Sequence, residues 1–344
     1  MGDETLIESV EQLDEAQSRP PEALVSFMRG LDGDIVVIGA GGKMGLSLAR
    51  MAKRAGDASA VPRRVIAVSR FTDRKAREAL HEAGVETLAC DLLEESAVDA
   101  LPGVENVVFM AGWKFGSAGD PARLWATNVY LPARVMRRYR GSRVVVFSTG
   151  NVYPFVPPET GGCTEEQPAA PVGEYAQSCL GRERVAAWCS GRDSTPTAII
   201  RLNYAIDLRY GVLLDIGLKV YRGEPVDLRM GWVNVIWQAD ANAAALLALG
   251  AASVPPFVLN VTGPEILSVR RIAESFGNEF SRAPVFAHEE ECTALLSHAG
   301  RFRKLFPIPL TSTRRMIRLV AHWIQIGGPT WGKPTGFERR DGVF

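Results

Sequence analysis

Short apolar segments alternate with longer helical ones from residue 34 to about residue 203, and this alternation constrains the fold most strongly. Strands are predicted at 34–39, 64–69, 86–90, 105–111, 143–148 and 197–202, and helices at 42–56, 73–83, 94–100, 121–140 and 174–190. Continuous apolar strands joined by crossover helices are typical of a parallel sheet that is buried on both faces. The sequence therefore predicts an α/β protein with a doubly wound parallel sheet.

Three glycines lie where the first predicted strand meets the helix that follows. Gly39, Gly42 and Gly45 have the spacing Gly-x-x-Gly-x-x-Gly in IVVIGAGGKMGLSLAR. Such glycines permit a tight turn and a close backbone approach to a pyrophosphate, which then faces the N–H groups at the start of the helix. Because strand, glycines and helix occur in this order, a dinucleotide site that includes Lys43 and Met44 is predicted. The alternative is a glycine-rich turn without a ligand.

The end of the second predicted strand bears on which dinucleotide binds. An acidic residue there would bind the 2′-hydroxyl of the adenosine ribose, but this strand ends in Ser69 and Arg70. A carboxylate would repel a 2′-phosphate, whereas serine and arginine can bind one. The sequence therefore favours NADP over NAD. The alternative is that Arg70 simply points into solvent.

The loss of regular alternation after residue 203 suggests four parts. They are a helical prefix at 1–33, a Rossmann domain at 34–203, a smaller mixed α/β substrate lobe at 204–330 that can return strands to the sheet, and an arm at 331–344. We expect the helices of the prefix to pack on the sheet.

Charge and cysteine content argue against several classes of partner and of binding site. The chain has 39 Lys and Arg and 39 Asp and Glu residues, which argues against nucleic acid or an anionic membrane as the main partner. Its five cysteines form no Cys-x-x-Cys pair and its four histidines lie apart, so neither a metal site nor a disulfide framework is expected. No apolar run reaches the roughly 18 residues of a membrane span, and the acidic N-terminus does not resemble a signal peptide. We expect a cytoplasmic protein with a small-molecule substrate.

Several ordered segments resemble the extended branch of the short-chain dehydrogenase/reductase superfamily, which contains sugar-nucleotide epimerases, dehydratases and reductases. Besides the glycines, these segments are CDLLEES, VVFMAGW, WATNVYLPARVM, VVVFSTGNVYP and FVLNVTGPEILSVRRIAESFG. The resemblance spans about residues 34–330. It implies adenine contacts from Asp91 and Leu92, cofactor contacts from Ala111 and Gly112, a helical asparagine at Asn128, a catalytic hydroxyl at Thr149, and an acid/base tyrosine at Tyr175.

The chain departs from the family pattern at three positions. The family's Tyr-x-x-x-Lys reads Tyr175-x-x-x-Cys179, Phe109 replaces a histidine, and the hydroxyl at residue 149 is threonine rather than serine. A cation within about 4–6 Å lowers a phenol pKa by roughly 1–3 units, and the neutral thiol of Cys179 supplies no such charge. Oxidation of an alcohol needs a base, whereas reduction of a carbonyl needs an acid, which a neutral tyrosine already is. We therefore expect either a bias towards reduction or a substitute cation.

Two substitute cations are candidates. Lys114 lies in the loop after the fourth strand, where ligands bind in open α/β sheets, although an ordinary solvated lysine is an equal alternative. Arg182 lies about 10 Å further along the helix than Tyr175 and is the poorer candidate. Cys179 itself is either a reactive thiol or a small buried side chain.

The segment after the sixth strand resembles the family's entry into the substrate lobe, which implies substrate contacts from Asn203 and Tyr204. The main functional hypothesis is an NAD(P)-dependent oxidoreductase or epimerase that acts on a sugar, a sugar nucleotide or a sugar-like compound. The alternative is a dinucleotide-binding protein with impaired turnover, which acts as a redox sensor or a subunit partner. The resemblance also implies a homodimer through the helices at 121–140 and 174–190.

Overall fold

The computed structural model describes residues 5–114, 116 and 119–343. The first four residues of the predicted prefix and the last residue of the predicted arm lie outside this range. A seven-stranded parallel sheet has the order β11-β6-β5-β4-β1-β2-β3. Its strands are β1 (Ile35–Ile38), β2 (Val65–Ser69), β3 (Glu86–Ala89), β4 (Asn106–Phe109), β5 (Arg143–Thr149), β6 (Thr197–Leu202) and β11 (Phe257–Val261). The predicted doubly wound α/β fold is confirmed, and β11 joins the sheet from beyond residue 203.

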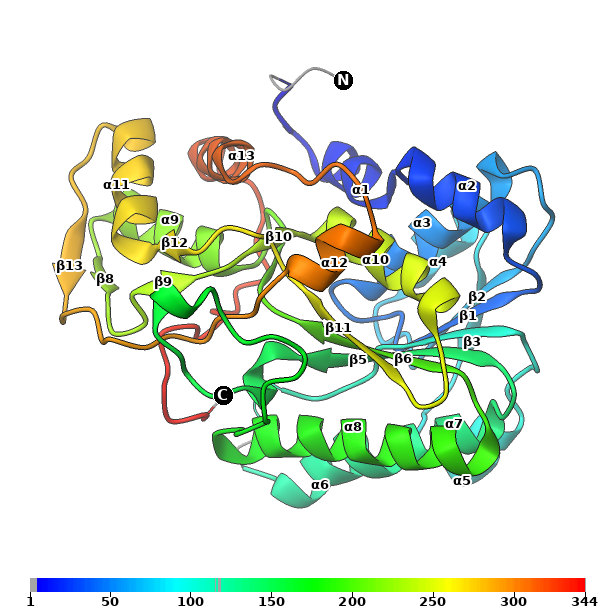
Figure 1. Ribbon diagram of the computed structural model, residues 1–344. Helices are drawn as coiled ribbons and strands as arrows, with labels where there is room; N and C mark the ends of the chain where they lie inside the picture. Colours follow the sequence, from blue (N-terminus) through cyan, green and yellow to red (C-terminus); the bar gives the residue numbers. More distant parts are fainter. Residues whose placement is uncertain (1–4, 115, 117–118, 344) are drawn as a thin grey trace.

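Helices cover both faces of the sheet (Figure 1). One face carries α5 (Glu95–Asp99), α6 (Pro121–Trp125), α7 (Leu131–Arg138) and α8 (Gly173–Asp193), and the other carries α3 (Gly45–Ala58) and α10 (Gln238–Leu247). The remaining helices are α1 (Val10–Ser18), α2 (Glu22–Gly30), α4 (Arg74–Glu82), α9 (Val212–Arg222), α11 (Val269–Phe280), α12 (Gly300–Leu305) and α13 (Thr313–Gln325). Three two-stranded sheets belong to the region after residue 203: β7 (Ala205–Ile206) with β10 (Ile236–Trp237), β9 (Trp232–Val233) with β12 (Leu267–Ser268), and β8 (Pro225–Asp227) with β13 (Val285–Ala287).

Strand β1 shows how the sheet separates two hydrophobic cores. Ile35 and Val37 pack in the core on the α3 side, whereas Val36 and Ile38 pack in the core on the α7 side. Successive side chains of a strand point to opposite faces, so four consecutive apolar residues fill both cores. All four are fully buried, and burying each such side chain contributes about 1.5–3 kcal/mol.

The predicted helix at 121–140 is one continuous helical segment but is not α-helical throughout. A π-helical turn (Ala126–Tyr130) separates α6 from α7. Such a turn adds a residue to the helix without breaking it and is often found at functional sites. Hydrophobic periodicity does not reveal it, because the residues on both sides remain helical.

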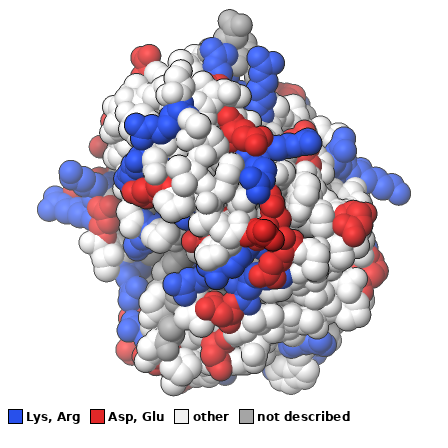
Figure 2. Space-filling view, turned by 90° about the vertical axis from the view of Figure 1, so that its left-hand side faces the viewer, with Lys and Arg blue, Asp and Glu red and all other residues white. Residues whose placement is uncertain are grey.

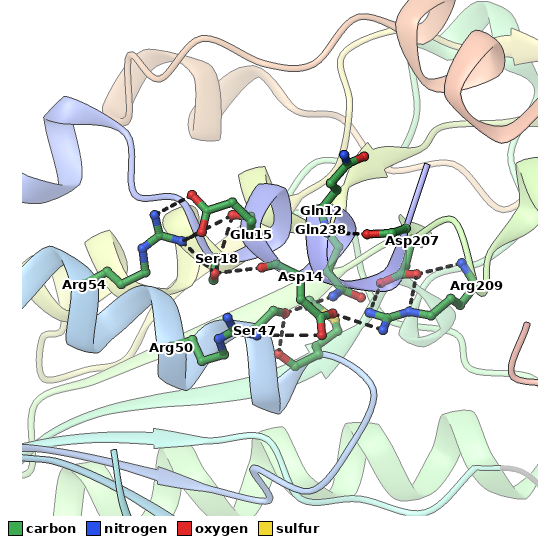
Figure 3. Close-up of polar contacts among 12 residues, drawn as sticks. Gln12, Asp14, Glu15, Ser18, Ser47, Arg50, Arg54, Asp207, Arg209 and Gln238 are labelled. Carbon is green, nitrogen blue, oxygen red and sulfur yellow. Dashed lines mark hydrogen bonds and ion pairs between the residues drawn. The ribbon is translucent and has the colours of Figure 1, made fainter. Parts of the chain in front are cut away.

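The prefix helices differ from expectation in their position. α1 and α2 contact α3 and α10 rather than the sheet, because these two helices already cover that face. Figure 3 shows the polar side of the contact, in which Glu15 of α1 accepts hydrogen bonds from Arg54 of α3. Asp14 forms ion pairs with Arg50 of α3 and with Arg209, which follows β7. The prefix therefore joins the helix that follows the glycine loop to the region after residue 203.

The surface agrees with the balanced charge of the sequence. Figure 2 shows basic and acidic side chains interspersed on the face that it presents. Among the described residues, no helix is long and apolar enough to cross a membrane, and no group of His, Cys, Asp and Glu side chains could hold a metal ion. All five cysteines are free.

The packing of the prefix yields a stability prediction. Leu13 is fully buried in the core, so Leu13→Ala should lower the free energy of unfolding by about 2–5 kcal/mol. Glu15→Ala removes a partly exposed ion pair and should cost less than about 1 kcal/mol. Urea unfolding of both variants checks this, and equal effects would contradict the apolar contact as the dominant one.

Candidate active site

The glycine loop is held tightly between β1 and β4. Gly39 has a φ of +94°, and a Cβ there would lie 2.6 Å from the backbone nitrogen of Ala111. A Cβ at Gly45 would lie 2.6 Å from Ala40. Only glycine fits these two positions without a shift of the backbone. The loop therefore lies directly against the segment after β4, where the order of the sheet reverses, and ligands bind at such a switch point.

A cavity of about 350 Å³ opens at this loop. The three glycines, Lys43 and Met44 form one part of its wall, and Gly112, Lys114, Thr149 and Tyr175 form another. Asn203 and Tyr204 also line it. The structure thus brings the predicted phosphate-binding loop, the predicted catalytic hydroxyls and the predicted substrate residues to one cavity. The free space and the missing Cβ atoms of the loop fit the diphosphate and nicotinamide portion of a dinucleotide.

The residues predicted to hold the adenosine end lie beyond this cavity, at the neighbouring strand ends. Ser69 ends β2, and its Oγ would lie 2.4 Å from a Cβ placed on Gly41. Arg70 follows and is exposed. Asp91 and Leu92 follow β3, and Asp91 Oδ1 accepts a hydrogen bond from the backbone of Leu93. The end of β2 therefore presents the hydroxyl of Ser69 beside the loop and is followed by the exposed Arg70.

Thr149 is the last residue of β5, and Tyr175 lies in the first turn of α8. The two side chains meet because these two element ends lie together. Their side chains share a hydrogen bond, and Tyr175 also bonds with Cys179. Burial raises the pKa of Tyr175 well above its ordinary value, and Cys179 adds to this. The charge of Arg182 and the bond with Thr149 oppose the rise only in part. Tyr175 is therefore a neutral phenol at neutral pH.

Cys179 occupies a small apolar cluster with Val152, Tyr153 and Cys163. Its side chain is 1% exposed, and burial raises its pKa. A reactive cysteine needs a stabilised thiolate and access to solvent, and Cys179 has neither. The buried environment favours a space-filling thiol over a reactive one.

Arg182 acts on the tyrosine electrostatically although it lies seven residues further along the helix. Its buried guanidinium donates hydrogen bonds to Asn128 Oδ1 (2.8 Å) and to the carbonyl oxygen of Phe147 (2.8 Å). Side chains of a helix point towards its N-terminus, so the long arginine reaches back towards Tyr175. Its charge lowers the pKa of both Tyr175 and Cys179. Helix rise alone, which made Arg182 the poorer candidate, does not take this side-chain direction into account.

Lys114 lies near the tyrosine but belongs to the loop after β4, not to α8. Its Nζ lies 5.4 Å from the centre of the Tyr175 ring. Burial lowers the pKa of Lys114 to about 8, so its charge is partly lost just above neutral pH. The structure places this lysine in the cavity wall rather than on the solvated surface.

Asn128 lies behind the cavity wall, in the π-helical turn, and is fully buried. Its Nδ2 donates to Ser178 Oγ (2.9 Å) and to the carbonyl oxygen of Trp113 (3.0 Å), and its Oδ1 accepts from the backbone of Trp113. These bonds fix the loop that carries Lys114 against α8. Asn128 therefore positions other groups rather than lining the cavity.

Several further cavity residues were not singled out from the sequence, and three of them show why. Asn151 follows β5, Gln238 begins α10, and Thr335 lies in the C-terminal segment. Asn151 belongs to the quoted segment VVVFSTGNVYP and could have been found there. No local pattern marks Gln238 or Thr335, because only the folded chain brings them to the glycine loop.

The sequence model of the NAD dependent epimerase/dehydratase family matches residues 35–204. Through this segment the chain belongs to that family. The matched range contains the glycine loop, Thr149 and Tyr175, and it ends at the predicted substrate residues. The chain is thus an NAD(P)-dependent enzyme of the extended short-chain dehydrogenase/reductase type.

Solved structures agree in fold. MoeE5, solved with UDP-glucose and NAD, has 20% identity and a TM-score of 0.69 over 86% of this chain and 99% of its own. WbmG from Bordetella bronchiseptica, solved with NAD and UDP, has 18% identity and a TM-score of 0.71 over 89% and 99%. UDP-glucose 4-epimerase from Thermotoga maritima has 16% identity and a TM-score of 0.69 over 85% and 98%. No curated protein sequence matches the chain.

The glycine loop of this epimerase/dehydratase family member can be tested directly. Gly39→Ala should raise the Kd for NADPH at least 100-fold, because the added Cβ would push the loop away from Ala111. Gly191→Ala is a matched control on α8, where a Cβ meets no atom within 4 Å. Fluorescence titration with NADPH measures both, and equal affinities would contradict a role of the loop in binding.

Proposed function

We propose that the chain is an NADP-preferring enzyme that favours reduction of the carbonyl group of a sugar, a sugar nucleotide or a sugar-like compound. The observation that carries this proposal is the shared cavity, which joins the glycine loop to a neutral Tyr175 hydrogen-bonded with Thr149. A bound nicotinamide dinucleotide supplies or accepts the hydride. Solved structures with UDP-glucose, UDP-glucuronic acid or UDP support a sugar-related substrate.

The proposed mechanism assigns the proton to Tyr175. In reduction, the carbonyl oxygen of the substrate accepts hydrogen bonds from Thr149 Oγ1 and from Tyr175 Oη, and the phenol gives up its proton as the hydride arrives. The positive charges of Arg182 and Lys114 stabilise the phenolate that results, because opposite charges attract strongly where water is excluded. Asn128 holds the loop of Lys114 against α8 through its hydrogen bonds with Trp113 and Ser178.

The raised pKa of Tyr175 makes the opposite direction slow at neutral pH. Oxidation needs the phenolate, whose fraction increases tenfold with each pH unit as long as the pH stays below the pKa. An epimerase or dehydratase that begins by removing an alcohol proton meets the same limit. The raised pKa of Tyr175 supports reduction as the proposed direction.

This bias predicts different pH profiles for the two directions. With a keto-sugar and NADPH, kcat should change less than threefold between pH 6 and pH 8, because the acid form of Tyr175 persists. Oxidation of the product alcohol should rise about tenfold per pH unit up to pH 9, as expected for a base whose pKa lies higher. Tyr175→Phe should lower kcat for reduction at least 100-fold and leave the Kd for NADPH within threefold. A bell-shaped oxidation profile centred near pH 7 would contradict the proposal.

Cofactor preference is attributed to Ser69 and Arg70, since the exposed guanidinium group can pair with a 2′-phosphate. Arg70→Ala should raise the Kd for NADPH about tenfold, equivalent to about 1.4 kcal/mol, and leave the Kd for NADH unchanged. Arg74→Ala is the control, because Arg74 already pairs with Glu78. Fluorescence titration of each variant with both cofactors checks this. If Arg70→Ala weakened both cofactors equally, Arg70 would not be the discriminating residue.

The second candidate function is a dinucleotide-binding protein without turnover, and Cys179 is the observation that favours it. Both candidates bind NADPH, but only the enzyme oxidises it in the presence of keto-sugars. Failure to bind either cofactor would overturn both.

We also propose a cytoplasmic homodimer. The free cysteines support this location. Exposed aromatic side chains on the helices of residues 121–193, namely Trp125, Tyr130 and Trp188, support a contact between two copies.

A further inference from the structure

The C-terminal arm, defined here as residues 331–343, crosses the molecule close to the cavity. In Figure 1 this red segment descends from the side of α13 to the start of α8. Its first attachment is at Trp331, whose backbone nitrogen donates to the carbonyl oxygen of Arg209 (3.0 Å) and whose ring lies 5.0 Å from the Arg209 guanidinium group. Its second attachment is at Thr335. The backbone nitrogen and Oγ1 of Thr335 both donate to Asp215 Oδ2 of α9, at 2.7 and 2.6 Å.

Two more attachments fix the far half of the arm. Arg340 donates to the backbone oxygen and side-chain hydroxyl of Thr293, at 2.7 and 2.6 Å, and pairs with Glu291. Gly342 lies against Gly173, where an added Cβ would be 2.4 Å from the Gly342 carbonyl oxygen. Since α8 begins at Gly173, Gly342 contacts this helix two residues before Tyr175 in the sequence. The arm therefore links the region after residue 203 to the helix of the acid/base tyrosine.

The arm also forms part of the cavity wall. Thr335 lines the 350 Å³ cavity. Gly336, Phe337 and Gly342 line an adjoining hollow of about 20 Å³, whose other wall includes Lys114 and Asn151. That hollow has room for about one water molecule. Phe337 is 3% exposed and so plugs the space beside the catalytic residues.

We propose that the C-terminal arm closes the substrate end of the site and restricts it to substrates of about one sugar ring, so that a sugar linked to a nucleotide enters only when the arm is released. This inference rests on the proposed function. Ligand pockets span about 300–1,000 Å³, so a cavity of 350 Å³ that also takes the nicotinamide leaves little room. A nucleotide attached to the reacting sugar would need room beyond this cavity, and the arm fills the adjoining space beside Lys114 and Asn151.

Release of the arm is physically reasonable because polar contacts make most of its attachments. Trp331, Lys333 and Arg339 are exposed, and Phe337 is its one large buried apolar side chain among the described residues. The double variant Phe337→Ala/Arg340→Ala removes the plug and the Thr293 and Glu291 contacts together. Arg74→Ala, on an exposed helix away from the arm, is the control.

The test uses the fluorescence of bound NADPH in the full-length protein, so it does not depend on turnover. Two quenchers carry the same nitroxide: 4-hydroxy-TEMPO, which is one ring, and TEMPO linked to uridine diphosphate. In the wild type and in Arg74→Ala, the one-ring quencher should have a quenching constant at least fivefold larger than the nucleotide-linked one. In the double variant this ratio should fall at least threefold, while the Kd for NADPH stays within threefold.

A second measurement compares kcat/KM for free keto-sugars and for their nucleotide-linked forms. The wild type should favour the free forms at least tenfold. Equal access of both nitroxides to the wild type, or a wild-type preference for nucleotide-linked sugars, would overturn the size limit while leaving the proposed function intact. If no reduced dinucleotide binds, the proposed function fails, and the inference fails with it.

Discussion

The contact between Gly39 and Ala111 is the constraint on which the site depends. The two residues follow adjacent parallel strands, and the absence of a side chain at Gly39 lets the backbones meet. This brings the glycine loop beside the segment that leads to Gly112 and Lys114. Because parallel strands place their carboxyl ends at one edge, Thr149 at the end of β5 arrives at the same edge. The glycine loop and the hydroxyls of Thr149 and Tyr175 thus share a cavity as a consequence of sheet topology.

Charge near the tyrosine is arranged differently from the family pattern. A neutral thiol stands at the position of the lysine. Arg182 further along α8 lowers the pKa of Tyr175, and Lys114 on the loop after β4 lies beside the Tyr175 ring. Arg182 is held by the carbonyl of Phe147 and by Asn128, so its position depends on β5 and on the π-helical turn as well as on α8. The net result leaves the pKa of Tyr175 raised. A buried neutral phenol suits a proton donor better than a base.

The prefix and the C-terminal arm both lie outside residues 35–204, which match the family, and they are linked through Arg209. Asp14 in the prefix pairs with Arg209, and Arg209 stacks on Trp331 in the C-terminal arm. The prefix and the first residue of the arm therefore both contact Arg209. Arg209 is the shared residue, and it is also held by Asp207 (Figure 3). This arrangement connects the helix that follows the glycine loop to the arm, whose Thr335 lines the cavity.

The sequence by itself determined the sheet, the glycine loop and the pair Thr149–Tyr175, because strand alternation, glycine spacing and ordered motifs are local signals. Only the tertiary structure decided the reach of Arg182, the π-helical turn at Asn128, the entry of β11 into the sheet, and the presence of Thr335 in the cavity. None of these features leaves a periodic pattern in the sequence. They depend on side-chain direction on a helix, on an inserted helical residue, and on contacts across more than a hundred residues. Their positions follow from packing, which brings distant segments together only after the chain has folded.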